Sequence, residues 1–225
     1  MRNLNKSFKI CAIVILFCVF MAIIDGVLHA NYAIKSLIKL VIFLALPALY
    51  AHYDNTLQAK NLFTVNKQGV ALSLGLGAII YLIILGGYLL LKNVFDFSAI
   101  TTSLTNNIGV NRNNFIFVSL YISFVNSLLE EFFFRGFAFL TLKKVSTRRF
   151  AYLFSAIAFA LYHVAMMIGW FSIEVFIIVL AGLFAGGLIF NYLNEKSNTI
   201  YPSWLVHMFA NFAINTIGFM LFDII

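Results

Sequence analysis

The sequence predicts an all-α fold, a polytopic transmembrane helical bundle, and three observations support this prediction. Of the 225 residues, 63% are hydrophobic and only 10% are charged, with a mean hydropathy of +0.98. A water-soluble chain of this composition would have too little polar surface to cover itself. Apolar runs long enough to cross a hydrocarbon layer of roughly 30 Å recur along the chain, and they lack the two-residue alternation of β-barrel strands.

About seven apolar runs mark the predicted spans, within a single integral membrane domain of residues 1–225. Each run is rich in Leu, Ile, Phe and Ala, and a short, more polar segment separates it from the next. An eighth span would result if the fourth run were broken. The predicted spans are residues 8–25, 33–53, 69–92, 113–142, 149–168, 171–193 and 199–222.

Several local features accompany these runs. The first run also loosely fits a secretory signal peptide ending near Ala30, but the charge distribution is explained with the run retained. Residues 97–111 are too polar to span and are expected to lie along the membrane surface. In the sixth run, Gly182 and Gly186 are four residues apart, a spacing that favours close helix packing.

The net charge of +7 indicates membrane topology and not nucleic-acid binding, because Lys and Arg form short clusters between the apolar runs. A cytoplasmic amino terminus puts the densest cluster, residues 143–149, on the cytoplasmic side as well. We therefore expect a multi-pass protein of the cell membrane. Cys11 and Cys18 lie inside the first run, so neither a disulfide framework nor a thiolate metal site is expected.

The fourth run contains two adjacent carboxylates, Glu130 and Glu131, where each charge costs roughly 2.5–3.5 kcal/mol on membrane-insertion scales. The other acidic residues, among them Asp25, lie near predicted span ends that water can reach. Arg135 follows Glu131 by four residues, so the two share a helix face and can pair. Glu130 points about 100° away and is expected to be unpaired, which suits a proton acceptor.

Two histidines and an amide occur at a similar depth in other runs. His163 lies in the fifth run, and His207 lies in the seventh run with Asn211 one turn later. Glu130 and His163 are each about 20 Å from the cytoplasmic edge by helical rise, and His207 is roughly 15 Å from it. The four polar side chains are therefore expected to meet in one layer.

Two kinds of chemistry fit this layer. In the first, Glu130 with His163 polarises a water that attacks a peptide carbonyl, while His207 and Asn211 donate hydrogen bonds to the oxyanion. In the second, Glu130, His163 and His207 bind Zn²⁺ and leave one position for water. The sequence does not decide between them. Two further interpretations are a purely structural ion-pair lock and an ion-coupled transporter, although no paired helix breaks support the latter.

Three motifs in these runs resemble those of the CAAX prenyl protease and bacteriocin-processing family, the Abi-type intramembrane proteases. They are E-E-x-x-x-R from Glu130 and Glu131 to Arg135, F-x-x-x-H from Phe159 to His163, and H-x-x-x-N from His207 to Asn211. Each spacing alone recurs by chance in helices, but three in order on separate spans make a specific signal. The resemblance covers about residues 113–215, which we interpret as a catalytic core.

The resemblance implies an intramembrane endopeptidase that cleaves prenylated or amphipathic membrane-associated peptides. It makes Glu130 the base, His163 its partner, His207 and Asn211 the oxyanion or metal-ligand pair, and Glu131 with Arg135 the support of the site. The expected partners are a peptide or protein substrate and the lipid bilayer. The alternative is a non-catalytic immunity or scaffold protein of the same family, in which these residues only hold helices together.

Overall fold

The computed structural model describes residues 3–28, 30–54, 59–65 and 67–225, and every regular element in them is helical. The elements are α1 (Leu4–Ile23), η1 (Ile24–Leu28), α2 (Tyr32–Leu40), η2 (Val41–Ala45), α3 (Leu46–Asp54), α4 (Ala59–Leu62), α5 (Lys67–Leu91), α6 (Ser98–Ile108), α7 (Phe115–Leu120), η3 (Tyr121–Asn126), α8 (Ser127–Glu130), η4 (Glu131–Thr141), α9 (Leu142–Val145), α10 (Arg148–Met167), α11 (Ile173–Ser197) and α12 (Tyr201–Leu221). Those labelled η are π-helical.

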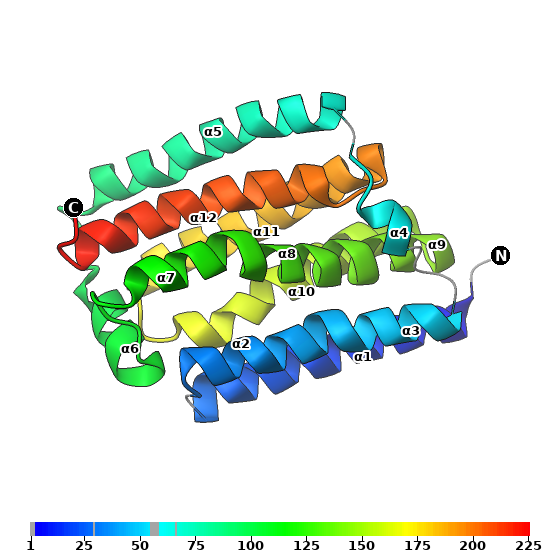
Figure 1. Cartoon of the computed structure of the whole chain (residues 1–225), viewed down its shortest axis with the longest axis horizontal. Coiled ribbons are helices and arrows are strands. Elements are labelled where there is room, and N and C mark those ends of the chain that lie inside the picture. The colour runs from blue at the N-terminus through cyan, green and yellow to red at the C-terminus, as the bar shows by residue number, and fades with distance from the viewer. Residues whose placement is uncertain (1–2, 29, 55–58, 66) are drawn as a thin grey trace.

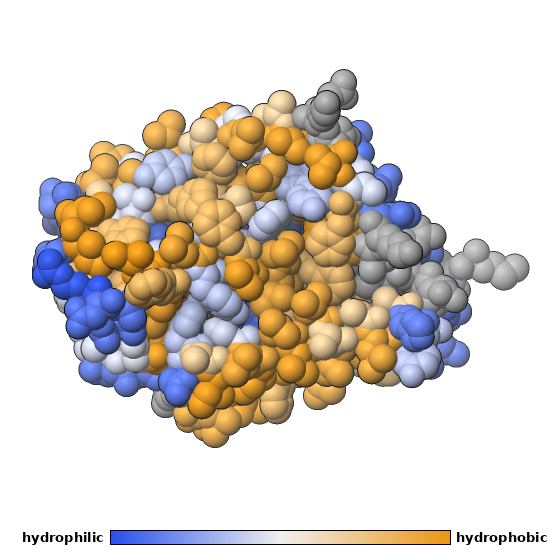
Figure 2. Space-filling view, viewed as in Figure 1, coloured by the Kyte–Doolittle hydropathy of each residue, from blue (hydrophilic) through white to orange (hydrophobic). Residues whose placement is uncertain are grey.

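Within the described part of the chain, seven helical segments are long and apolar enough to cross a membrane, which confirms the all-α polytopic bundle. They are Leu4–Leu28, Tyr32–Tyr53, Gly69–Leu91, Phe115–Val145, Arg148–Met167, Ile173–Ser197 and Tyr201–Leu221. Figure 2 shows hydrophobic side chains across the middle of the molecule and hydrophilic ones gathered toward the two ends of its long axis. This distribution matches a helical bundle whose long axis crosses the bilayer.

The fourth span, from α7 to α9, is one helix and is not broken into two spans. It contains two π-helical stretches, η3 and η4. A π turn accommodates an additional residue while the backbone hydrogen bonding continues, so the helix changes register without a break. The chain therefore has seven such spans in its described residues, and the eight-span arrangement is not found.

The helices lie side by side in a flattened bundle (Figure 1). The hairpin of α1 with α2 to α3 forms one edge, and α5 packed on α12 forms the opposite edge. The fourth span lies between these edges, together with α10. The contact between α5 and α12 is close, because a Cβ on Gly77 would lie 2.6 Å from the ring of Phe209.

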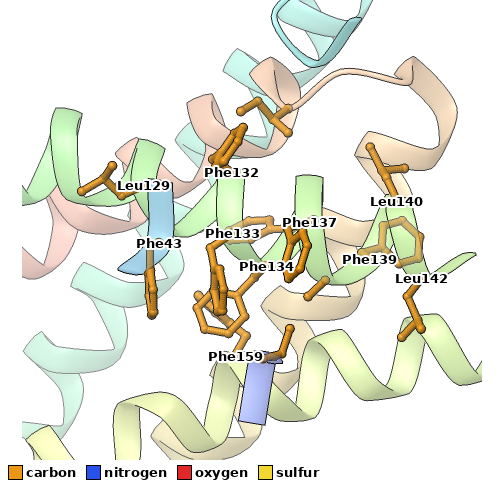
Figure 3. Packing of buried hydrophobic residues seen from close by; sticks show 14 of the residues in the cluster. Phe43, Leu129, Phe132, Phe133, Phe134, Phe137, Phe139, Leu140, Leu142 and Phe159 are labelled. Atoms are coloured by element: carbon orange, nitrogen blue, oxygen red, sulfur yellow. The ribbon is translucent and has the colours of Figure 1, made fainter. Parts of the chain in front are cut away.

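The core of the bundle is built around η4, all of whose residues are buried. Its phenylalanines pack against helices on both sides (Figure 3). The ring of Phe133 stacks on Phe43 of η2 at 4.1 Å, and Phe134 meets Phe159 of α10 edge to face at 5.4 Å. Glu131, at the start of η4, and the adjacent Glu130 are thus held by a closely packed aromatic core.

Two expectations about the spans are wrong in detail. Asp25 does not lie at a span end in water, because η1 extends the first span to Leu28; Asp25 is buried and pairs with Lys35 at 2.6 Å. Gly182 and Gly186 face open space, whereas a Cβ on Gly187 would lie 3.0 Å from Cα of Ala156. Gly187 is therefore the residue that allows α11 to approach α10 closely.

The polar segment before the fourth span forms α6 at one end of the bundle, and none of its side chains is fully buried. Just before it, Asp96 accepts hydrogen bonds from the backbone N–H and the hydroxyl of Ser98. These bonds stabilise the carboxylate and lower the pKa of Asp96 below its usual value.

Candidate active site

Glu130, the last residue of α8, is almost fully buried and is not unpaired as expected. Its Oε1 accepts hydrogen bonds from Nζ of Lys39 at 3.1 Å and from Nδ2 of Asn126 at 2.9 Å. Lys39 also donates to Oδ1 of Asn126 at 2.6 Å, which closes a ring of three hydrogen bonds. The sequence reasoning missed Lys39, although a lysine in the second apolar run was a visible signal.

The other oxygen of Glu130 faces both predicted histidines. Oε2 lies 3.7 Å from Nε2 of His163 and 3.7 Å from Nε2 of His207, and it has no hydrogen-bond partner among the described residues. These distances exceed those of a direct hydrogen bond. Helices α8, α10 and α12 thus bring a carboxylate oxygen and two ring nitrogens together around one point.

The partners of the Nδ1 atoms fix which ring nitrogen carries hydrogen in each neutral imidazole. Nδ1 of His163 lies 2.7 Å from the carbonyl oxygen of Phe159, and Nδ1 of His207 lies 2.9 Å from Oε1 of Glu131. Because both oxygens can only accept, both Nδ1 atoms donate, as assigned from this network. Each Nε2 therefore directs a lone pair toward Glu130.

Glu131 and Arg135 form the expected pair, but the contact is loose. Nε of Arg135 lies 3.5 Å from Oε2 of Glu131, and both side chains are 0% exposed. The guanidinium packs over the rings of Phe159 at 4.0 Å and Phe190 at 4.9 Å. Its charge is thus stabilised by one carboxylate and two aromatic faces. Glu131 connects this cation to His207 on α12.

Asn211 lies one turn after His207 on α12, and the structure ties its amide to the fourth span. Its Nδ2 donates to the carbonyl oxygen of Ile122 at 3.1 Å, within η3. One turn further, Nδ2 of Asn215 donates to the Ser119 carbonyl and the Ser123 hydroxyl. These amides hold α12 against the fourth span. Glu130, His163 and His207 thus converge, whereas the observed contact of Asn211 is with the backbone.

A similar bond fixes α10, which carries His163. The hydroxyl of Ser155 donates to the carbonyl oxygen of Phe134 in η4 at 2.8 Å, and Ser155 also contacts Oδ1 of Asn191 on α11 at 3.3 Å. The helix then continues for two turns to His163, the most exposed of the three converging side chains at 13%. Polar side chains on neighbouring helices therefore set the position of each histidine.

The residues as arranged do not form a metal site. A tetrahedral Zn²⁺ about 2.0–2.2 Å from its ligands would set neighbouring donor atoms about 3.3–3.6 Å apart, slightly closer than the 3.7 Å contacts of Glu130 with the two imidazoles. The ammonium group of Lys39 also compensates the carboxylate that a dication would require. No group of three His, Cys, Asp or Glu side chains in the described ranges could hold a metal ion.

These features define a multi-pass α-helical membrane protein with a buried glutamate and histidine cluster. Residues 112–213 match the family model described as type II CAAX prenyl endopeptidase Rce1-like. The match confirms the resemblance to the CAAX protease family, and it covers the helices that carry Glu130, His163 and His207, while Lys39 lies outside it. No curated protein and no solved structure matches the chain.

Proposed function

We propose that this protein is an intramembrane endopeptidase that cleaves prenylated or amphipathic membrane-associated peptides with a water activated by Glu130. One observation carries the proposal: Oε2 of Glu130 lies 3.7 Å from Nε2 of His163 and 3.7 Å from Nε2 of His207, and in the neutral imidazoles each of these nitrogens offers a lone pair. A water about 2.8 Å from Oε2 would donate its two hydrogens to two of these three acceptors. The match to an endopeptidase family supports this interpretation.

In the proposed reaction, Glu130 takes a proton from this water as the oxygen attacks the substrate carbonyl carbon. The tetrahedral intermediate then collapses, the C–N bond breaks, and the proton passes from Glu130 to the leaving amine nitrogen. The products are a new carboxyl terminus and a free amine, so no other reactant is needed. The hydrogen bonds from Lys39 and Asn126 to Oε1 leave Oε2 available for the proton transfer.

The two imidazoles are suited to different tasks because their Nδ1 partners differ in charge. Glu131 is a carboxylate and would stabilise a proton that Nε2 of His207 takes from solvent when the substrate binds, whereas the Phe159 carbonyl would stabilise such a charge on His163 much less. With that proton in place His207 would donate from Nε2 to the oxyanion, and neutral His163 would orient the water with Glu130. The second amide hydrogen of Asn211 is a further candidate donor, since only one is used on Ile122.

The test is hydrolysis of a farnesylated peptide carrying a fluorophore and a quencher on either side of its prenylated cysteine, by purified protein in detergent. Glu130→Gln keeps the size and the amide hydrogen bonding but removes the base, so kcat should fall by roughly 10²–10⁴. Glu174→Gln is the control, because Glu174 is exposed at the start of α11. Normal turnover by folded Glu130→Gln protein would contradict the proposal and favour a scaffold or immunity role.

We further propose a cytoplasmic amino terminus in the cell membrane, supported by the basic cluster in α9 and the first turn of α10. In a background with Cys11 and Cys18 changed to Ser, an impermeant maleimide should label Asn106→Cys on intact cells. It should label Arg149→Cys only after lysis. The reverse pattern would overturn this topology.

A further inference from the structure

The first helical hairpin contributes charged residues to the interior, although it lies outside the family match. Lys35 and Lys39 are one turn apart on α2, and both are buried, with exposed fractions of 4% and 5%. Lys35 pairs with Asp25 of the same hairpin at 2.6 Å. Lys39 instead reaches the fourth span and contacts Glu130. The two lysines share helix, burial and charge but have different carboxylate partners.

Lys39 determines how the carboxylate of Glu130 is oriented. Lys39 and Asn126 both donate to Oε1, and their own hydrogen bond at 2.6 Å fixes the two donors relative to each other. A carboxylate held at one oxygen by two donors has little freedom to rotate, so Oε2 stays directed at His163 and His207. The ammonium group itself is held over the ring of Tyr162 at 5.0 Å.

Lys39 also completes the charge balance of the buried cluster. Glu130 and Glu131 contribute two negative charges, and Arg135 contributes one positive charge beside Glu131. Lys39 supplies the second positive charge directly at Glu130. In a medium of low dielectric constant, a charge pair this close interacts strongly, so removal of Lys39 would leave the cluster with an uncompensated charge at Glu130.

We propose that Lys39 is a positioning residue of the active site, which holds Oε1 of Glu130 and thereby directs Oε2 toward the imidazoles. The inference rests on the endopeptidase function proposed above. It assigns to the first hairpin a part in the chemistry, in addition to anchoring the protein. A residue that acts through Glu130 should change kcat more than KM, because it does not contact the substrate.

The experiment compares Lys39→Met, Lys39→Arg and the matched control Lys35→Met, with hydrolysis of the farnesylated peptide as the readout. Each methionine variant removes one buried lysine and leaves one buried carboxylate without its cation, so both should lose thermal stability similarly. Lys39→Met should lower kcat at least tenfold with KM within twofold, whereas Lys35→Met should retain the wild-type kcat per folded molecule. Lys39→Arg keeps the charge and should recover much of the loss.

A second readout is independent of turnover: the carboxyl ¹³C resonance of Glu130 in glutamate-labelled protein, assigned by its loss in Glu130→Gln. This signal should shift in Lys39→Met and remain unchanged in Lys35→Met. An unchanged resonance, or equal kcat values for the two methionine variants, would overturn the role of Lys39. If the wild-type protein cleaves no peptide but Lys39→Met still shifts the Glu130 resonance, only the endopeptidase function is contradicted. If Lys39→Met does not fold, the comparison uses Lys39→Arg and Lys39→Gln. Wild-type kinetics and a wild-type Glu130 resonance in Lys39→Arg would support the role of the charge. The same properties in Lys39→Gln would contradict it.

Discussion

His207 donates a hydrogen bond from Nδ1 to Oε1 of Glu131 across 2.9 Å, which joins α12 to η4 through a buried carboxylate. Glu131 therefore has two partners, one in the candidate active site and one in the core. It accepts a hydrogen bond from the imidazole that faces Glu130, and it pairs with Arg135 in the core. These two roles can be separated by substitution.

Glu131→Gln retains an oxygen for His207 but removes the negative charge that would stabilise positive charge developing on this ring during the reaction. We expect kcat to fall roughly 10²–10³-fold, in line with the loss of an oxyanion donor. Arg135→Gln removes the cation instead and leaves the Glu131 contact to His207 intact. It should mainly reduce the yield of folded protein, with a smaller decrease in kcat per folded molecule. Equal kcat values for the two variants would contradict these separate roles.

Asn211 and Asn215 form a matched pair for testing the oxyanion role. Both are buried on α12 and donate to the fourth span. Changing either one to Leu should lower the free energy of unfolding by about 1 kcal/mol, measured as thermal stability in detergent. Only Asn211→Leu should also lower kcat, by about 10²-fold. A wild-type kcat in Asn211→Leu would mean that Asn211 acts only as a structural link.

The close approach of α10 and α11 at Gly187 makes a prediction about stability. Gly187→Leu would force its side chain against the backbone of Ala156, and overpacking of this kind costs about 1–3 kcal/mol. Gly186→Leu is the adjacent control, since Gly186 faces open space. Thermal unfolding in detergent should show a lower midpoint for Gly187→Leu only. A similar decrease in both variants would show that any leucine at this level of α11 is harmful.

The geometry around Glu130 also predicts the response to chelators. Because Lys39 already compensates this carboxylate, prolonged treatment with 1,10-phenanthroline should leave peptide hydrolysis unchanged. The control is a zinc-dependent peptidase treated in parallel, which should lose activity. Loss of activity in this protein, with recovery on addition of one equivalent of Zn²⁺, would support the metal-ligand interpretation of Glu130, His163 and His207.

The apolar spans and their order could be predicted from the sequence because hydrophobic length is a local property. Glu130 and Glu131 can also be identified from the local sequence, because they are charged residues inside an apolar run. Asp25 was misplaced because η1 extends the first span past it, and nothing in the local sequence indicates where a helix that is already apolar will end. The all-α class is thus a simpler prediction than the span boundaries.

Lys39 stands out in the sequence as a lysine inside an apolar run, but its partner could not be identified there, because Glu130 lies 91 residues further along the chain. The π-helical turns of the fourth span could not be predicted from the sequence either. Their carbonyl oxygens bond to side chains of other helices, such as Asn211 to Ile122 in η3 and Ser155 to Phe134 in η4. Because these partners lie on other helices, the neighbouring sequence of the fourth span does not reveal them.

The two buried lysines of α2 differ in when they can be neutralised during biosynthesis. Asp25 and Lys35 belong to one hairpin, so this pair can form as soon as the first two spans enter the bilayer together. Among the described residues of this hairpin, no carboxylate pairs with Lys39, and its partners Asn126 and Glu130 arrive only with the fourth span. The newly inserted hairpin therefore carries one uncompensated ammonium group, and docking of the fourth span both neutralises that charge and assembles the glutamate site.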